Sequence, residues 1–163
     1  MEGDVELKQV SRIHAIMAER MVKSWSEAPQ FYLSMEVNLD PALKVKRKLD
    51  SQGVNASLTD LIVFAVARAL AQFPQLNAYW DNGAIRQGKS TNVGIAVAKG
   101  EEIVVVVVQD ADRKSIQELV AETQGLVTRA RTGRFTLDDI SGGTLTVSNL
   151  GMFGVDRFTA ILN

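Results

Sequence analysis

The 163-residue sequence contains no cysteine and only one histidine, His14. The absence of cysteine excludes disulfide bonds, a thiol nucleophile and thiolate metal ligands within this chain. Charge is nearly balanced, with 18 Lys and Arg residues against 19 Asp and Glu residues. No apolar segment reaches the length of a membrane span, because Arg68 interrupts the most apolar helix. We therefore expect neither nucleic acid nor a membrane as a partner.

Composition is ordinary for a globular protein, with 46% hydrophobic and 23% charged residues. A chain of this length suffices for one domain with a sizeable core. The first nine residues, MEGDVELKQ, lack the apolar core of a signal peptide. We interpret residues 1–9 as the remnant of a linker or the start of an expressed fragment, and residues 10–163 as the domain itself.

Helix and strand signals alternate through the first half of the chain. Ser11 can cap a helix that carries an apolar stripe, and Pro29 ends that helix. Residues 31–39 alternate between apolar and polar side chains, which predicts a half-buried strand. Asp40 followed by Pro41 is typical of a helix start.

Two further local signals follow. Ser57 with Asp60 predicts a capping box at the start of a strongly apolar helix, which Pro74 ends. Residues 81–83, Asp-Asn-Gly, predict a turn between two short strands.

The second half of the chain contains the longest apolar strands. Residues 92–98 and 103–108 should form two of them, and the second, IVVVVV, is apolar on both faces. We expect this strand to be buried on both sides and central in its sheet. Ser115 opens a helix that Gly133 ends, and a strand over residues 144–148 follows. The pattern predicts an α+β sandwich with a mostly antiparallel or mixed sheet.

The segment GGTLTVSNLGMFGVD, residues 142–156, combines an alternating strand with a glycine-rich turn. Alternation directs Leu145 and Val147 toward the core, so Ser148 should end the strand and face a cleft or a subunit interface. A serine nucleophile needs a base within hydrogen-bond reach, and His14 is the only histidine. From the residues alone, Ser148 is either a structural hydroxyl or the nucleophile of a hydrolase that uses His14.

Other polar groups have less specific interpretations. A basic cluster on the second helix is either a solvated face or a site that attracts a phosphorylated cofactor. It consists of Lys44, Lys46, Arg47 and Lys48. Asp110 and Asp112 have no further carboxylate or histidine at suitable spacing, so we expect turn and helix-capping roles and no metal. The glycines form no G-x-G-x-x-G fingerprint, so a dinucleotide fold is not indicated.

The chain from Val10 to Asn163 resembles the catalytic domain of the dihydrolipoyl acyltransferases, the core components of 2-oxo acid dehydrogenase complexes. The matching segments, in order, are VSRIHAIMAERM, APQFYLSMEVNLD, SLTDLIVFAVARALAQFPQLNAYW, NVGIAVA, VVVVVQDADRKS and GGTLTVSNLGMFGVD with RFTAILN. The sequence departs from the family pattern at Gln30, where histidine is frequent, and at Val106 and Gln109, where proline and arginine are usual. His14 stands where arginine or lysine is common, so we expect a structural or surface role for it.

The resemblance implies an α+β sandwich fold like that of chloramphenicol acetyltransferase, with a mixed β-sheet flanked by helices. It also implies assembly as a homotrimer or as a larger 24- or 60-subunit core. The implied substrates are coenzyme A and a lipoyl group carried on a separate lipoyl domain, with no metal. The partners would be that lipoyl domain and the other components of the dehydrogenase complex. SNLGMFG is similar to the acetyl-transferring type that serves pyruvate dehydrogenase. The expected location is the bacterial cytoplasm or the mitochondrial matrix.

The resemblance also implies residue roles. Ser148 would donate a hydrogen bond to the oxyanion of the tetrahedral intermediate, and Asn149, Gly151 and Gly154 would form the supporting turn. The general base of the family belongs to a His-Arg-x-x-Asp-Gly segment, which residues 1–163 do not contain. In the family this histidine and the serine come from neighbouring subunits of the trimer. We therefore expect a catalytic domain that is incomplete at its C-terminus and inactive alone; the alternative is a non-catalytic, trimer-forming scaffold fragment.

Overall fold

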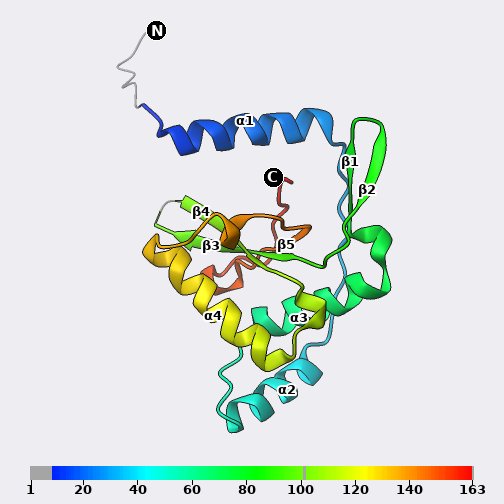
Figure 1. Cartoon of the computed structure of the whole chain (residues 1–163). Helices are drawn as coiled ribbons and strands as arrows, with labels where there is room; N and C mark the ends of the chain where they lie inside the picture. Colours follow the sequence, from blue (N-terminus) through cyan, green and yellow to red (C-terminus); the bar gives the residue numbers. More distant parts are fainter. Residues whose placement is uncertain (1–8, 101, 163) are drawn as a thin grey trace. The chain divides into compact units, whose positions relative to one another are not determined.

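The computed structural model describes residues 9–100 and 102–162 (Figure 1). The chain divides into two compact units. The smaller unit holds helix α1 with the residues up to Glu36 and the chain from Gly154 onward, and the larger unit runs from Val37 to Phe153. In the described ranges, no helix has both the length and the apolar character needed to cross a membrane.

The smaller unit is built on α1, which spans Arg12–Glu27. Ser11 caps this helix as predicted, because its hydroxyl oxygen accepts a hydrogen bond from the backbone N–H of His14 at 3.2 Å. After the helix, residues 29–34 line an open hollow of about 460 Å³ together with residues 157–160 and Leu162.

The predicted half-buried strand over residues 31–39 is wrong. No strand is formed there among the described residues, and the side chains of Leu33 and Met35 are 88% and 87% exposed. An apolar–polar alternation becomes a strand only where a neighbouring strand completes its backbone hydrogen bonds. The described part of the chain supplies no such neighbour.

The larger unit contains the remaining elements. Its α-helices are α2 (Asp40–Ser51), α3 (Leu58–Gln72) and α4 (Ile116–Thr132). Its strands are β1 (Ala78–Asp81), β2 (Ala84–Gln87), β3 (Val93–Lys99), β4 (Glu102–Val108) and β5 (Leu145–Val147). Single 3₁₀ turns are η1 (Pro74–Leu76), η2 (Ala111–Arg113), η3 (Asp138–Ile140) and η4 (Gly151–Phe153).

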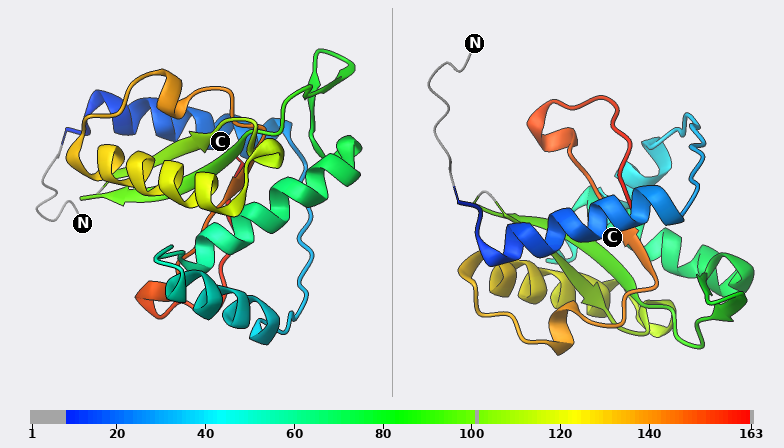
Figure 2. Two further views of the ribbon diagram at one scale, coloured as in Figure 1. Left: turned by 60° about the horizontal axis from the view of Figure 1, so that its bottom comes forward. Right: turned by 90° about the horizontal axis from the view of Figure 1, so that it is seen from above.

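The local signals in this unit are confirmed. Ser57 and Asp60 form a capping box at α3, and Ser115 forms another with Glu118 at α4. Gly133 ends α4 in the left-handed conformation, with φ of 71°. Residues 81–83 connect β1 to β2 in an antiparallel hairpin that projects from the rest of the unit (Figure 2).

The main sheet has the order β4-β3-β5, with β3 antiparallel to β4 and parallel to β5. The predicted mixed sheet is confirmed, but the predicted central place of the valine strand is wrong, because β4 lies at an edge. Only Val106, Val107 and Val108 are buried, whereas Ile103 is 59% exposed. Helix α4 packs along β3 and β4 (Figure 1). A Cβ atom at Gly143, in the connection before β5, would lie 3.2 Å from Cγ2 of Val107. A helix and a loop therefore cover the apolar run in place of another strand.

The core of the larger unit lies between this sheet and helices α3 and α4 (Figure 2). Its fully buried side chains come from α3, β3, β4 and α4; they include Val63, Val93, Val106, Val108 and Leu119. Gly94 belongs to the same layer, in the central strand. A Cβ atom at this position would lie 2.8 Å from Cγ1 of Val105 and 2.9 Å from Oγ1 of Thr146, on the two flanking strands. The absence of a side chain at Gly94 therefore allows both neighbours to approach.

Helix α4 is joined to the segment that leads into β5 by one ion pair. Asp139 accepts hydrogen bonds from Nε and Nη2 of Arg129 at 2.9 and 2.6 Å, and from the backbone N–H of Thr136 at 2.9 Å. The bonds from Arg129, followed by the bond from Thr136, lower the pKa of Asp139 from its ordinary 3.8 to about 2.

We predict that Gly94→Ala lowers the free energy of unfolding by about 1–3 kcal/mol, because the added methyl group overpacks two β-branched neighbours. Urea unfolding followed by circular dichroism measures the change. Gly125→Ala is the matched control: its Cβ would approach only the guanidinium end of Arg129, at 3.3 Å, within α4. This control should stabilise the helix by about 0.5–1 kcal/mol. An unchanged midpoint for Gly94→Ala would contradict the packing argument.

A second prediction concerns the contribution of Asp139 to stability at low pH. The folded-state pKa of Asp139 is lowered, so its stabilising contribution is complete above about pH 4 and is lost as the pH falls through about 2. Water screens the pair because the side chain of Arg129 is 44% exposed, so we expect Asp139→Asn to cost about 1 kcal/mol at pH 7. The difference from the unmodified chain should shrink at pH 2.5. Asp138→Asn, which removes a carboxylate with no ion pair among the described residues, is the control.

Candidate active site

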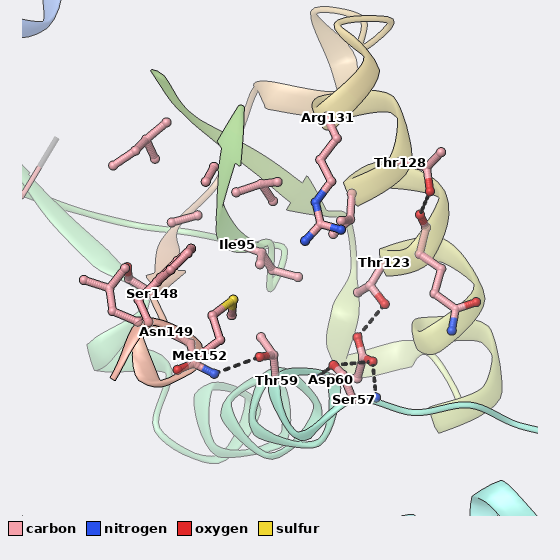
Figure 3. Close-up of a pocket in the computed structure, with 18 of the residues that line it drawn as sticks. Ser57, Thr59, Asp60, Ile95, Thr123, Thr128, Arg131, Ser148, Asn149 and Met152 are labelled. Carbon is pink, nitrogen blue, oxygen red and sulfur yellow. Dashed lines mark hydrogen bonds between the residues drawn. The ribbon is translucent and has the colours of Figure 1, made fainter. Parts of the chain in front are cut away.

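A cleft of about 580 Å³ opens within the larger unit. It is lined by the first turn of α3, by strand β3, by one side of α4 and by the segment that follows β5 (Figure 3). Ile95, Val97 and Val127 give it an apolar wall, and Arg131 extends into it from α4. The cleft therefore combines a water-excluding surface with a few polar groups, the usual composition of a small-molecule site.

Ser148 directly follows β5 and lines this cleft, which is the position that strand alternation predicts. Leu145 and Val147 pack against the core, whereas Thr146 is exposed. Within the part of the chain that the structure describes, the hydroxyl of Ser148 has no hydrogen-bond partner. The hydroxyl is therefore available to donate a hydrogen bond to a bound molecule.

The turn after Ser148 is held by Asn149. The side-chain Oδ1 of Asn149 accepts a hydrogen bond from the backbone N–H of Gly151 at 2.9 Å, and its Nδ2 donates to Oγ1 of Thr59 at 3.1 Å. Gly151 begins the turn η4, and Gly154 has the positive φ of 74°. The structure thus brings Asn149 and Gly151 together, and the left-handed backbone at Gly154 accounts for the glycine there.

The cleft wall also contains a buried carboxylate, that of Asp60 in the first turn of α3. Asp60 is 5% exposed, and its Oδ2 accepts hydrogen bonds from both the backbone N–H and the hydroxyl of Ser57 at 2.7 Å. Its Oδ1 accepts a bond from Oγ1 of Thr123, on α4, at 2.6 Å. These three bonds account for a charge that would otherwise be costly to bury, and they join the start of α3 to α4.

The other groups singled out in the sequence lie elsewhere. His14 Nδ1 lies 3.2 Å from the hydroxyl of Ser11, at the start of α1, and His14 is not among the residues that line the cleft. The basic cluster lies on α2 and does not line the cleft either; within it, Lys46 pairs with Asp50 at 2.8 Å. The cluster therefore fits a solvated helix face.

Asp110 adopts the left-handed conformation, with φ of 43°, just before η2, and its side chain makes no capping bond there. Its predicted turn role is confirmed, whereas side-chain capping by Asp110 is not observed. Among the described residues, no group of histidine and carboxylate side chains is arranged to hold a metal ion.

Sequence reasoning missed Thr59, Thr123 and Arg131 as parts of this site. The spacing of a capping box marks Asp60, but nothing in the sequence indicates that its second oxygen binds a threonine 63 positions later. Helical spacing does place Thr123, Val127 and Arg131 on one side of α4, which is a usable signal once α4 is known to border a cleft.

The arrangement favours chemistry in which negative charge develops on an oxygen atom. A free serine hydroxyl at the cleft wall can donate to that oxygen, and the apolar surroundings strengthen the bond. The described residues that line the cleft all belong to the larger unit and include no histidine, so this unit supplies no imidazole base of its own to the serine.

Comparison with known proteins gives three findings. The sequence matches the family described as 2-oxoacid dehydrogenases acyltransferase (catalytic domain) over residues 2–163. The chain is 37% identical over 158 residues to the dihydrolipoyllysine-residue acetyltransferase component of pyruvate dehydrogenase complex from Rickettsia bellii. That match covers 94% of this chain and 38% of the Rickettsia protein, so the chain spans well under half of this relative.

Solved structures of similar proteins have the same fold as this chain. A truncated catalytic core of the 2-oxoacid dehydrogenase multienzyme complex from Thermoplasma acidophilum superposes with a TM-score of 0.90 at 29% identity, covering 98% of this chain and 75% of that one. Dihydrolipoamide acetyltransferase from Azotobacter vinelandii gives a TM-score of 0.83 at 29% identity, covering 98% and 68%. For the Azotobacter enzyme, the roles of a serine, a histidine and an asparagine in the catalytic mechanism have been investigated. These matches confirm the predicted α+β fold of the chloramphenicol acetyltransferase type.

We predict that Thr123→Val lowers the free energy of unfolding by about 1–3 kcal/mol, because it leaves the buried carboxylate of Asp60 without one of its donors. Chemical unfolding at pH 7 measures the loss. Thr132→Val is the matched control, since Thr132 lies on the same helix, is exposed, and bonds only to backbone carbonyls of its own helix. Equal stability of the two variants would show that the Asp60–Thr123 bond does not support the fold.

Proposed function

Because the chain belongs to the 2-oxoacid dehydrogenase acyltransferase family, as part of its catalytic domain, we propose that its cleft is an acyl-transfer site of a 2-oxo acid dehydrogenase complex. The proposed reaction moves an acyl group between the dihydrolipoyl-lysine of a separate lipoyl domain and coenzyme A. We propose acetyl as the acyl group. Similarity to the Rickettsia acetyltransferase component and the sequence SNLGMFG at residues 148–154 support that choice.

The observation that carries this proposal is the hydroxyl of Ser148 at the wall of the cleft, which has no hydrogen-bond partner among residues 9–100 and 102–162. In acyl transfer, a thiolate attacks the thioester carbonyl, and the carbonyl oxygen becomes negatively charged as the tetrahedral intermediate forms. The intermediate would then expel the other thiolate and re-form the carbonyl group. Ser148 would donate a hydrogen bond to the charged oxygen and form no covalent bond to the substrate. Since the charge is absent from the substrate, the bond favours the transition state over bound substrate.

The incoming thiol must also lose its proton, and Ser148 cannot remove it. Among the described residues that line the cleft, none is a histidine. We propose that the base comes from a His-Arg-x-x-Asp-Gly segment of a longer chain, supplied by a neighbouring subunit of a homotrimer. A polypeptide limited to these 163 residues would then lack its base. Assembly into a multienzyme core is supported by the likeness to the Thermoplasma core structure.

Two other functions have less support. A non-catalytic scaffold fragment is favoured by one observation, the missing imidazole at the cleft. A coding frame that continues into the His-Arg-x-x-Asp-Gly segment would argue against it. The serine hydrolase requires His14 as its base, yet His14 belongs to the smaller unit, where its ring lies 3.2 Å from the hydroxyl of Ser11. Labelling of Ser148 by an active-site serine probe would be needed to support the hydrolase.

We predict that the 163-residue polypeptide transfers acetyl groups from acetyl-coenzyme A to dihydrolipoamide at close to the background rate. A thiol with a pKa of about 8.5 is mostly protonated at neutral pH, and a positioned base contributes roughly 10²–10⁴-fold to the rate. A polypeptide that continues through the histidine segment should be active. A coupled assay compares the two; full activity of the shorter one would remove the need for the histidine.

In the extended polypeptide, Ser148→Ala should lower kcat by about 10²–10³-fold with little change in KM, the usual cost of losing one oxyanion donor. Ser90→Ala is the matched control, because Ser90 is exposed and lies outside the cleft. If Ser148→Ala retained the activity of the control, Ser148 would have no part in the mechanism.

A further inference from the structure

The side chain of Thr59 is the contact through which α3 holds the turn that carries Ser148. Its Oγ1 accepts the hydrogen bond from Nδ2 of Asn149 at 3.1 Å, across 90 positions of sequence. Both residues are part-buried, and both line the cleft (Figure 3). No role in catalysis follows from Thr59's place in the capping sequence, because the capping box uses only Ser57 and Asp60.

Thr59 sits on a rigid support. It is the second residue of α3, between the capping serine and the buried Asp60. Asp60 is bonded on one oxygen to Ser57 and on the other to Thr123 of α4. The first turn of α3 is therefore fixed from both sides, and the position of Oγ1 of Thr59 is fixed with it.

Both polar atoms of the Asn149 side-chain amide form hydrogen bonds. Its Oδ1 binds the backbone N–H of Gly151, which shapes the turn, while its Nδ2 binds Thr59, which anchors the turn to α3. A peptide bond joins Asn149 directly to Ser148, so the position of Asn149 affects that of Ser148. Without an acceptor at position 59, the amide of Asn149 would lose one of its two restraints, and Ser148 would be positioned only by the short strand β5 and by the remaining bond between Asn149 and Gly151.

We infer that Thr59 is a positioning residue for acyl transfer, acting through Asn149 on the hydroxyl of Ser148. This inference rests on the proposed function. An oxyanion donor is effective because it is already at the place where charge develops, and a displacement of about 1 Å can cost roughly 10²-fold in rate. In this inference Thr59 acts on the placement of the oxyanion donor, whose bond is made in the transition state, so its loss should act on kcat.

The test uses the extended polypeptide. Thr59→Val should lower kcat by about 10- to 10²-fold with little change in KM, and Thr59→Ser should restore most of the rate, because it returns the acceptor oxygen. Thr59→Ala, which lacks the same oxygen, should behave like Thr59→Val. Thr132→Val should leave kcat unchanged. Urea unfolding of each variant shows that the fold is retained, and the alanine variant gives the answer if the valine variant does not fold.

A double-mutant cycle separates positioning from a general structural effect. If Thr59 acts through Asn149, the double variant Thr59→Val with Asn149→Ala should be no slower than Asn149→Ala alone. Independent, multiplying losses would overturn the inference, as would wild-type kcat in Thr59→Val or a loss that Thr59→Ser does not rescue. If Ser148→Ala itself has full activity, the proposed function fails. If only the Thr59 variants are unaffected, the proposed function stands and the positioning role fails.

Discussion

The buried carboxylate of Asp60 is the interaction on which the cleft depends. One of its oxygens closes the first turn of α3, and the other reaches Thr123 on α4. A carboxylate on a residue that is only 5% exposed requires such partners, so the two helices cannot separate without leaving one of its oxygens without its donor. The same turn of α3 presents Thr59 to Asn149. One carboxylate therefore fixes the spacing of the cleft walls and the support of the glycine turn.

The cleft joins two kinds of surface with different tasks in the proposed reaction. Its apolar residues from β3, β4 and α4 exclude water, and Arg131, Gln124 and Asn55 offer polar groups. Coenzyme A also has two ends, a charged nucleotide and a less polar thiol arm. A water-poor wall beside Ser148 would lower the local dielectric constant, so one donated hydrogen bond would count for more there than in bulk water.

Sequence predicted the features that depend on neighbours along the chain. The caps at Ser11, Ser57 and Ser115 need only three or four adjacent residues, and the place of Ser148 follows from a short alternating strand. The errors arose where distant segments decide. Residues 31–39 have the alternation of a strand but no partner among the described residues, and β4 has the composition of a central strand but lies at an edge. The contact between Thr59 and Asn149 joins segments 90 positions apart, which no local pattern reveals.

The register in which β5 pairs with β3 decides which side chain follows β5 in the cleft wall. Val147 stands opposite Ile95, and the close approach at Gly94 admits Thr146 beside the central strand. If β5 shifted along β3 by one residue, either a valine or an asparagine would occupy the place where the strand ends, and every side chain of β5 would change faces. The hydroxyl of Ser148 would then be replaced at this place by the apolar side chain of Val147 or by the amide of Asn149, although no residue had been substituted. An inserted or deleted residue between η3 and β5 that shifted this register would therefore act like a substitution of Ser148, whereas one at the β1–β2 turn leaves the pairing of β5 with β3 intact.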